Sequence, residues 1–161
     1  MAQLKELDFS PFVKKSVTAV FSTMLSLDAD LFPSDGSVMV TDKEKYMGHV
    51  GLAGKVAGAV CLIFSKELAS FLAASMLGLE PEEVAPEEVR DVIGELCNMV
   101  GGNIKSRLCD MGYTCALTIP SITSGKNFNF QPLKDPIRRS YAFKTNDFVW
   151  LLELYLKENV S

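Results

Sequence analysis

The segment from Glu87 to Met111 constrains the fold more than any other part of the sequence. Its apolar residues return every three to four positions, the spacing that places them on one face of an α-helix; they are Val89, Val92, Ile93, Leu96, Val100 and Ile104. Gly112 follows Met111 and is a usual residue at a helix end. We therefore predict a long helix over residues 87–111, with its apolar stripe facing the core.

Helix-like and strand-like segments alternate through the rest of the sequence. We predict a helix from Pro11 to Leu31, which Ser10 and Pro11 begin, and a shorter one from Lys66 to Leu77 that ends at Gly78. The segment from Glu80 to Pro86 reads as a linker. Strand-like runs are rich in β-branched and aromatic residues; they are Val38–Thr41, Tyr46–Phe64 (a hairpin interrupted near residues 53–55), Thr114–Thr123, Phe128–Gln131, Ile137–Lys144 and Phe148–Lys157.

The last strand-like run alternates most clearly, because every second residue from Phe148 to Leu156 is large and apolar. Residues 145–147 are a plausible turn joining it to the run before. The two halves of the chain, divided near residue 82, each begin with a long helix and continue into strands, which suggests a loose internal repeat. We predict one α+β domain over residues 1–161, with helices packed on a mostly antiparallel sheet.

Composition excludes several classes of function. The 16 basic and 20 acidic residues give a net charge of -4, and the one basic cluster, around Lys134, Arg138 and Arg139, is too small for a nucleic-acid interface. No window has the roughly 18–20 apolar residues of a membrane span, and the N-terminus lacks the pattern of a secretory signal. Four scattered cysteines and one histidine offer too few zinc ligands. We expect a cytoplasmic protein with free thiols and no metal site.

Polar residues occupy the face of the long helix opposite the apolar stripe. Asp91, Glu95, Asn98 and Gly102 fall within about 60° of one another on a helical wheel. They are either a solvated helix face or a surface that contacts a partner. Two glycines inside a helix cost roughly 1 kcal/mol each relative to alanine. Gly101 and Gly102 therefore serve either close packing or the close approach of a partner beside Asn98.

The segment from Asp91 to Asn98 carries a family resemblance. Its sequence fits the pattern Asp/Ser-x-x-x-Glu-x-x-Asn, and a proline, Pro120, follows about two dozen residues later. In these features, and along nearly the whole chain, the sequence resembles the CheC/CheX/FliY phosphatases, and CheX in particular. The resemblance implies a CheC-like fold and a phosphatase that removes the phosphoryl group from an aspartyl-phosphorylated, CheY-like response regulator.

The resemblance also implies roles for individual residues. Asn98 would orient the attacking water through its amide, and Glu95 would pair with the regulator's active-site lysine. Asp91 and Gly102 would lie at the partner interface, and Mg²⁺ would belong to the regulator. Aligning the first helix with the pattern puts Lys14 at the position of Glu95 and Val17 at that of Asn98, so one site per chain is expected. CheX resemblance further implies a homodimer, through sheet edges.

Other readings of the same sequence stay open at this point. The chain could be a non-catalytic module of the same fold that binds or scaffolds a signalling or flagellar-switch partner, or its target could be a receiver domain of another two-component pathway. Residues 51–58 lack the spacing of a phosphate loop and sit inside a predicted hairpin. We interpret His49 as a structural residue and Cys97 as a small buried hydrophobe.

Overall fold

The computed structural model describes residues 3–33, 43–127 and 129–159. Its three α-helices are α1 (Ser10–Val20), α2 (Lys66–Leu77) and α3 (Pro86–Asp110), with 3₁₀ segments at Leu4–Glu6 and Pro81–Glu83 and a π-helical turn at Phe21–Leu25. The strands are β1 (Asp30–Leu31), β2 (Lys45–Gly54), β3 (Val56–Ser65), β4 (Cys115–Leu117), β5 (Ser121–Gly125), β6 (Ile137–Thr145) and β7 (Phe148–Glu158). The predicted strand at residues 38–41 lies outside the described residues.

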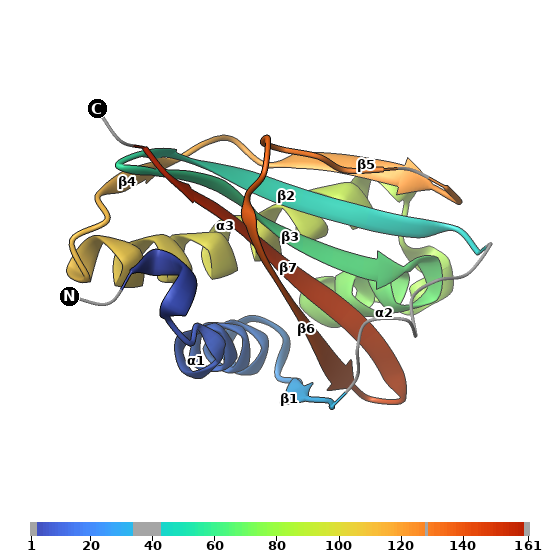
Figure 1. Ribbon diagram of the computed structural model, residues 1–161. Coiled ribbons are helices and arrows are strands. Elements are labelled where there is room, and N and C mark those ends of the chain that lie inside the picture. The colour runs from blue at the N-terminus through green and yellow to red at the C-terminus, as the bar shows by residue number, and fades with distance from the viewer. Residues whose placement is uncertain (1–2, 34–42, 128, 160–161) are drawn as a thin grey trace.

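The seven strands form one sheet in the order β1-β6-β7-β3-β2-β4, with β5 also paired to β2. All of these pairings are antiparallel. The three helices lie on the same side of the sheet (Figure 1), so the α+β prediction is confirmed. No helix in the described part of the chain is long and apolar enough to cross a bilayer.

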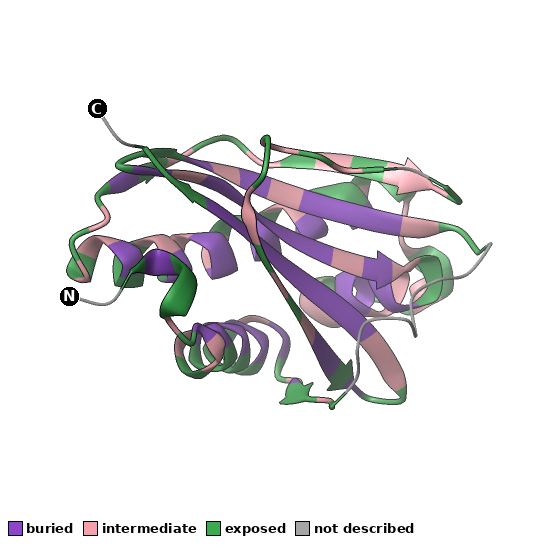
Figure 2. Cartoon of the chain, in the orientation of Figure 1, coloured by how far each residue is buried: buried purple, intermediate pink, exposed green. Residues whose placement is uncertain are grey.

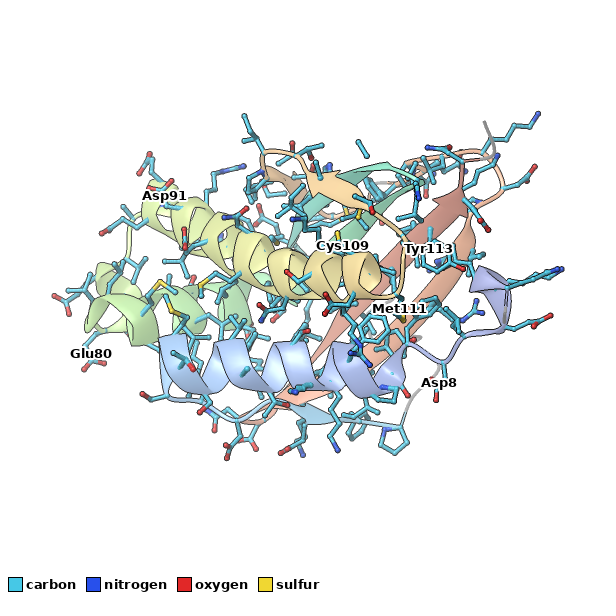
Figure 3. The ribbon with its side chains drawn as sticks, turned by 90° about the vertical axis from the view of Figure 1, so that its left-hand side faces the viewer. Asp8, Glu80, Asp91, Cys109, Met111 and Tyr113 are labelled. Carbon is cyan, nitrogen blue, oxygen red and sulfur yellow. The ribbon has the colours of Figure 1, made fainter. Side chains whose placement is uncertain are left out.

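The loose repeat takes a definite form in the strand order. β2 and β3 of the first half match β6 and β7 of the second, and β3 pairs with β7 at the centre of the sheet. Strands of each half also pair with the hairpin of the other half. β1 follows α1 and pairs with β6, while β4 and β5 follow α3 and pair with β2. α1 and α3 run in opposite directions side by side, since Asp8 at the start of α1 lies near Met111 at the end of α3 (Figure 3).

The core fills the space between the sheet and the helices (Figure 2). Its largest side chain, Trp150 on β7, is fully buried, as the alternating pattern predicted. The Trp150 ring stacks on Phe21 and Phe143 with centroids 5.0 Å apart, and its indole N–H donates to Thr145 Oγ1 at 2.9 Å. This donation satisfies the one polar atom of the tryptophan ring, so the side chain is buried without an unpaired donor.

Two helix ends follow the local rules that the sequence suggested. Ser65 Oγ accepts a hydrogen bond from the Leu68 amide at 3.1 Å and caps α2, and Gly78 closes that helix with a φ of 69°. At the end of α3, Gly112 has a φ of 95° and the Tyr113 amide donates to the Leu108 carbonyl at 2.9 Å. α3 is thereby fixed at the boundaries predicted for it to within one residue.

Three predicted segments were wrong in extent. The first helix does not reach Leu31: the chain leaves it at Ser26, which adopts the left-handed conformation with φ 55°, and residues 30–31 instead pair with β6. The run Thr114–Thr123 is two strands, because the bend at Thr118–Pro120 separates β4 from β5. Residues 129–131 are not a strand but cross the open face of the sheet, where Phe130 packs on His49 and Tyr155.

Candidate functional site

The outward face of α3 presents the polar residues predicted for it. Asp91, Glu95 and Asn98 are exposed, whereas the predicted apolar stripe on the opposite side is buried throughout. Residues three apart on a helix have Cβ atoms roughly 5–6 Å apart, so the carboxylate of Glu95 and the amide of Asn98 are neighbours. The buried stripe fixes the helix against the sheet, and the pair therefore stands on a rigid support.

The functional groups of this pair are not used inside the chain. Within the described residues, the side chains of Asp91, Glu95 and Asn98 make no hydrogen bond or ion pair. A carboxylate and an amide so placed keep their full donor and acceptor capacity for a partner: acceptors on Glu95, and both a donor and an acceptor on Asn98.

The two consecutive glycines of α3, Gly101 and Gly102, have different surroundings. A Cβ on Gly101 would clash with the Cγ2 methyl of Val50, so this glycine lets the helix lie close to β2. A Cβ on Gly102 would meet nothing within 4 Å. Packing therefore explains the first glycine and not the second, and Gly102 leaves a bare patch of helix surface one turn beyond Asn98.

A cleft of about 560 Å³ runs along the polar face of α3. Its helical wall includes Asp91, Glu95 and Asn98, and the facing wall is the bend between β4 and β5. Pro120 on that bend and Ile122 in β5 approach Gly94 of the helix, at about 3.9 and 3.8 Å from the position of a Cβ there. Pro120, which belongs to the sequence pattern, thus lies across the cleft from the Glu95 and Asn98 face.

Two residues of this cleft escaped the sequence analysis. Arg90 spans from α3 to β5, donating to the Ile122 carbonyl at 3.3 Å and to Ser124 Oγ at 2.7 Å. Ile119 is 86 % exposed at the bend. Sequence reasoning placed Ile119 inside a continuous strand; the signal that it had missed is the proline directly after it, which has no N–H to donate to a sheet and so interrupts a strand.

The burial of α1 shifts its alignment with α3 by one residue. The buried positions Val13, Ser16, Val17 and Val20 match Ile93, Leu96, Cys97 and Val100. Val17 is fully buried and so corresponds to Cys97, not to Asn98 as the sequence alignment had it. The exposed residues that correspond to Glu95 and Asn98 are then Lys15 and Thr18. The first half departs from the pattern in either alignment.

Other chemically capable groups do not form a site of their own. Burial raises the pKa of the Cys97 thiol to about 12, so this thiol stays protonated near neutral pH and Cys97 packs as the predicted hydrophobe. Residues 51–58 span the β2–β3 turn, as predicted. Among the described residues, no three His, Cys, Asp or Glu side chains gather into a group that could hold a metal ion.

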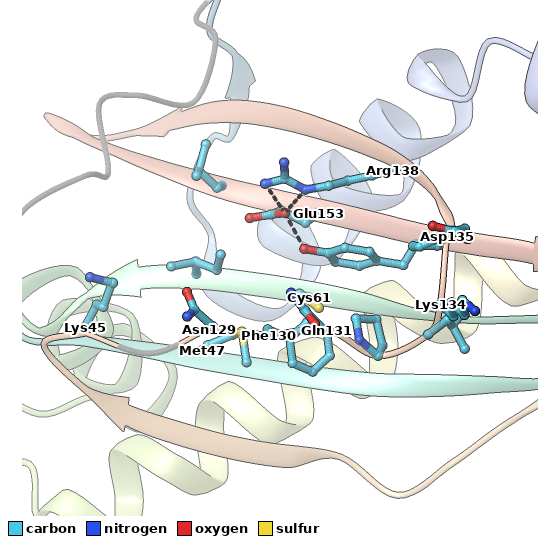
Figure 4. Close-up of a pocket in the computed structure, with 16 residues that line it drawn as sticks. Lys45, Met47, Cys61, Asn129, Phe130, Gln131, Lys134, Asp135, Arg138 and Glu153 are labelled. Carbon is cyan, nitrogen blue, oxygen red and sulfur yellow. Dashed lines mark hydrogen bonds and ion pairs between the residues drawn. The ribbon is translucent and has the colours of Figure 1, made fainter.

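A larger hollow, of about 800 Å³, lies on the opposite side of the sheet beneath residues 129–136 (Figure 4). Its central carboxylate, Glu153, is already engaged: Glu153 Oε2 lies 2.7 and 2.8 Å from two Arg138 nitrogens and accepts from the Tyr155 hydroxyl at 2.6 Å. This pairing compensates a charge that is otherwise buried. Its carboxylate is therefore already paired within the sheet, and the size of the hollow alone does not make it the better candidate.

Known proteins match this chain in both sequence and fold. The family described as chemotaxis phosphatase CheX matches residues 46–143. A relative from Thermotoga maritima, named CheY-P phosphatase CheX, is 29% identical over 103 residues, which is 62% of this chain and 64% of that relative. The matched part thus spans less than two thirds of the relative's length.

Solved structures share the fold over almost the whole chain. Chemotaxis protein CheX from Vibrio vulnificus superposes with a TM-score of 0.80 at 24% identity, over 97% of this chain and 100% of that one. A CheX–CheY–BeF3–Mg²⁺ complex from Borrelia burgdorferi gives a TM-score of 0.66 at 17% identity, over 95% of this chain and 100% of the matched chain. The family match covers α3 and the strands on both sides of it. Because it spans more than half of the sequence, the chain belongs to the CheX family of chemotaxis phosphatases.

Proposed function

We propose that the chain is a phosphatase that hydrolyses the aspartyl phosphate of a CheY-like response regulator. The observation that carries this proposal is the pair Glu95 and Asn98, exposed on a rigid helix beside an open cleft and unused by the rest of the described chain. Membership of the CheX family supports it, as do the name of the Thermotoga relative and the composition of the Borrelia complex. Such a protein acts where response regulators are found, in the cytoplasm.

The reaction is an in-line displacement at phosphorus. The oxygen of a water molecule bonds to phosphorus, the bond from phosphorus to the aspartyl oxygen breaks, and the regulator's carboxylate leaves with the electron pair; the proton lost by the water ends on phosphate or solvent. Because such a transition state has little covalent demand, positioning and charge neutralisation supply most of the catalysis. The regulator brings its own Mg²⁺ for the charge.

This chain positions the attacking water and the regulator. The Asn98 amide holds the attacking water in line with the bond that breaks, and because an amide is neutral it adds no negative charge near the phosphate. Glu95, one turn before it, pairs with the regulator's active-site lysine and fixes the register of docking. Asp91 lies at the edge of the same interface, and the bare surface at Gly102 lets the regulator approach α3 closely.

Phosphate release from a regulator charged with acetyl phosphate tests the proposal, with wild-type protein, Glu95→Ala, Asn98→Ala and Asn103→Ala. Asn103 is a matched control, since it is an exposed asparagine on the same helix but lies on another face. We expect Asn98→Ala to lose at least about 100-fold in rate, a typical loss when a reacting group is misplaced. Asn103→Ala should stay within about twofold of wild type, since it leaves the water-positioning amide in place.

The panel of regulators should include CheY-like proteins and receiver domains of other two-component pathways, because the helix pair alone does not select among them. Acceleration confined to one receiver identifies the substrate. If wild-type protein accelerates none of them, the enzyme proposal fails, and the non-catalytic binding module remains.

A further inference from the structure

The bend between β4 and β5 exposes a large apolar side chain at the mouth of the cleft. Ile119 is 86 % exposed, whereas the other exposed large hydrophobic residues in the described chain range from 37 to 43 %. A single exposed apolar residue is ordinary on a protein surface. The position of Ile119 is what sets it apart, because it lines the same cleft as Glu95 and Asn98.

The bend holds Ile119 outward from both sides. Before it, the Thr118 amide donates to the Gly51 carbonyl at 2.9 Å, and the Gly51 amide donates to Thr118 Oγ1 at 2.7 Å. After it, Arg90 binds the Ile122 carbonyl and the Ser124 hydroxyl. Pro120 in between fixes its own φ and keeps Ile119 in the extended region. The loop that exposes Ile119 is thus held in place by these hydrogen bonds, so little backbone freedom is lost when a partner covers Ile119.

The two walls of the cleft differ in chemistry. The helical wall is polar, with Asp91, Glu95 and Asn98, while the facing wall is largely apolar, with Leu117, Ile119 and Pro120. A partner that fits this cleft needs a charged or polar group to face α3 and an apolar patch beside that group. Such a division is usual in protein interfaces, where apolar anchors supply affinity and polar groups supply register.

We propose that Ile119 is the apolar docking contact for the phosphorylated receiver domain. This inference rests on the proposed function. Any partner that brings a phosphoryl group to Asn98 must enter the cleft and so cover Ile119 on its rim. A second copy of this chain seated on Ile119 would instead block the cleft, which is why the receiver domain is the occupant that the geometry favours.

The test combines Ile119→Ser with two comparison variants. Ile119→Met keeps an apolar side chain of similar size, and Leu77→Ser removes a different exposed apolar side chain, at the end of α2 and outside the cleft. Binding is measured by titrating each protein with a CheY-like regulator charged with beryllofluoride and Mg²⁺, and KM and kcat are measured separately from phosphate release.

Ile119→Ser should weaken binding and raise KM by about 10-fold or more, the size expected when a buried isoleucine contact is lost, with kcat within about twofold. Ile119→Met should restore binding, and Leu77→Ser should bind as wild type does. Unchanged binding of the regulator by Ile119→Ser would overturn the inference. So would an Ile119→Ser protein whose oligomeric state, measured by analytical ultracentrifugation, changes while its binding of the regulator does not. Wild-type protein that binds the beryllofluoride-charged regulator but does not accelerate phosphate release from the regulator charged with acetyl phosphate would contradict the proposed function and still leave the effect of Ile119 on binding measurable.

Discussion

The two halves of this chain share a helix-and-strand plan but differ in the strands that come after the long helix. After α1 comes β1, only two residues long, which pairs with the end of β6. After α3 come β4 and β5, which both pair with β2 and are joined by the bend at residues 118–120. Among the residues that the structure describes, the second half thus places a wall beside its helix, and the first half does not.

The outward helix faces differ as much as the strands beside them. Within the described part of the chain, the hollow on α1 is lined by residues between 11 and 23, including Lys14, Lys15 and Thr18, so it is a depression on one helical segment. The cleft on α3 is lined by two elements and carries a carboxylate and an amide. The comparison teaches that a polar helix face becomes a candidate site when a second element stands opposite it. In the described residues, the side-chain pair and the wall occur together in the second half of the repeat.

The largest expected effect comes from exchanging the two helix faces. Glu95→Lys with Asn98→Thr gives α3 the residues of α1, and we expect phosphate release to fall at least about 100-fold because no group positions the water. Adding Lys15→Glu and Thr18→Asn to that protein should restore nothing, since no described residue outside the helical segment 11–23 lines the hollow on α1. Steady-state phosphate release measures both. Recovery of activity in the fourfold variant would show that the helix face suffices without the wall.

Placing asparagine at two adjacent positions of α1 should have very different effects on stability. Val17 is fully buried, so Val17→Asn buries an amide without a partner and should lower the free energy of unfolding by about 2–4 kcal/mol. Thr18 is exposed, and Thr18→Asn should change it by less than about 0.5 kcal/mol. Urea denaturation of the two variants decides the alignment of the halves. Equal losses would contradict the one-residue shift.

The same pair of residues shows how far the sequence could predict the structure. Periodicity located α1, α3 and the core face of β7, because burial leaves a regular apolar pattern in each, whereas α2 was predicted from its end residues Ser65 and Gly78. It also identified Asp91, Glu95, Asn98 and Gly102 as one face. The predicted alignment of α1 with α3 was wrong by one residue. Ser16 and Val17 are both buried, and the three fixed residues of the pattern do not show which side of a helix packs against the core.

The features that the sequence could not predict depend on contacts between distant segments. The wall of the cleft exists because Thr118 binds Gly51 and Arg90 binds Ser124, pairs separated by more than 30 residues. The segment after β5 looked like a strand, yet Phe130 covers His49 and Tyr155 across the sheet. Local composition is the same for an aromatic residue in a strand and one on a covering loop, so tertiary packing decides between them.

An intermediate effect separates the two glycines of α3. Gly101→Ala should lower the free energy of unfolding by about 1–2 kcal/mol, since overpacking against Val50 costs about 1–3 kcal/mol and helix propensity returns up to about 1. Gly102→Ala should raise it by up to about 1 kcal/mol and lower kcat/KM, because the added methyl group stands where the regulator approaches. Urea denaturation and phosphate release measure the two changes. A stabilised Gly102→Ala protein with unchanged kcat/KM would remove Gly102 from the interface.

The smallest expected effect distinguishes the outer faces of the two halves by pH. His49 on β2 is paired with Cys61 on β3. In the second half, Ser140 on β6 holds the similar register position and is paired with Glu153 on β7. Burial lowers the pKa of the His49 imidazole below its usual 6.5. Between the lowered pKa and 6.5 the unfolded chain binds more protons than the folded one, so the free energy of unfolding falls as the pH drops through this window. His49 is the only histidine in the sequence, so His49→Gln should remove this slope between pH 7.5 and 5.5, while Ser140→Ala should keep it. Urea denaturation at both pH values measures it, and a slope that survives in His49→Gln would assign the pH dependence to groups other than this imidazole.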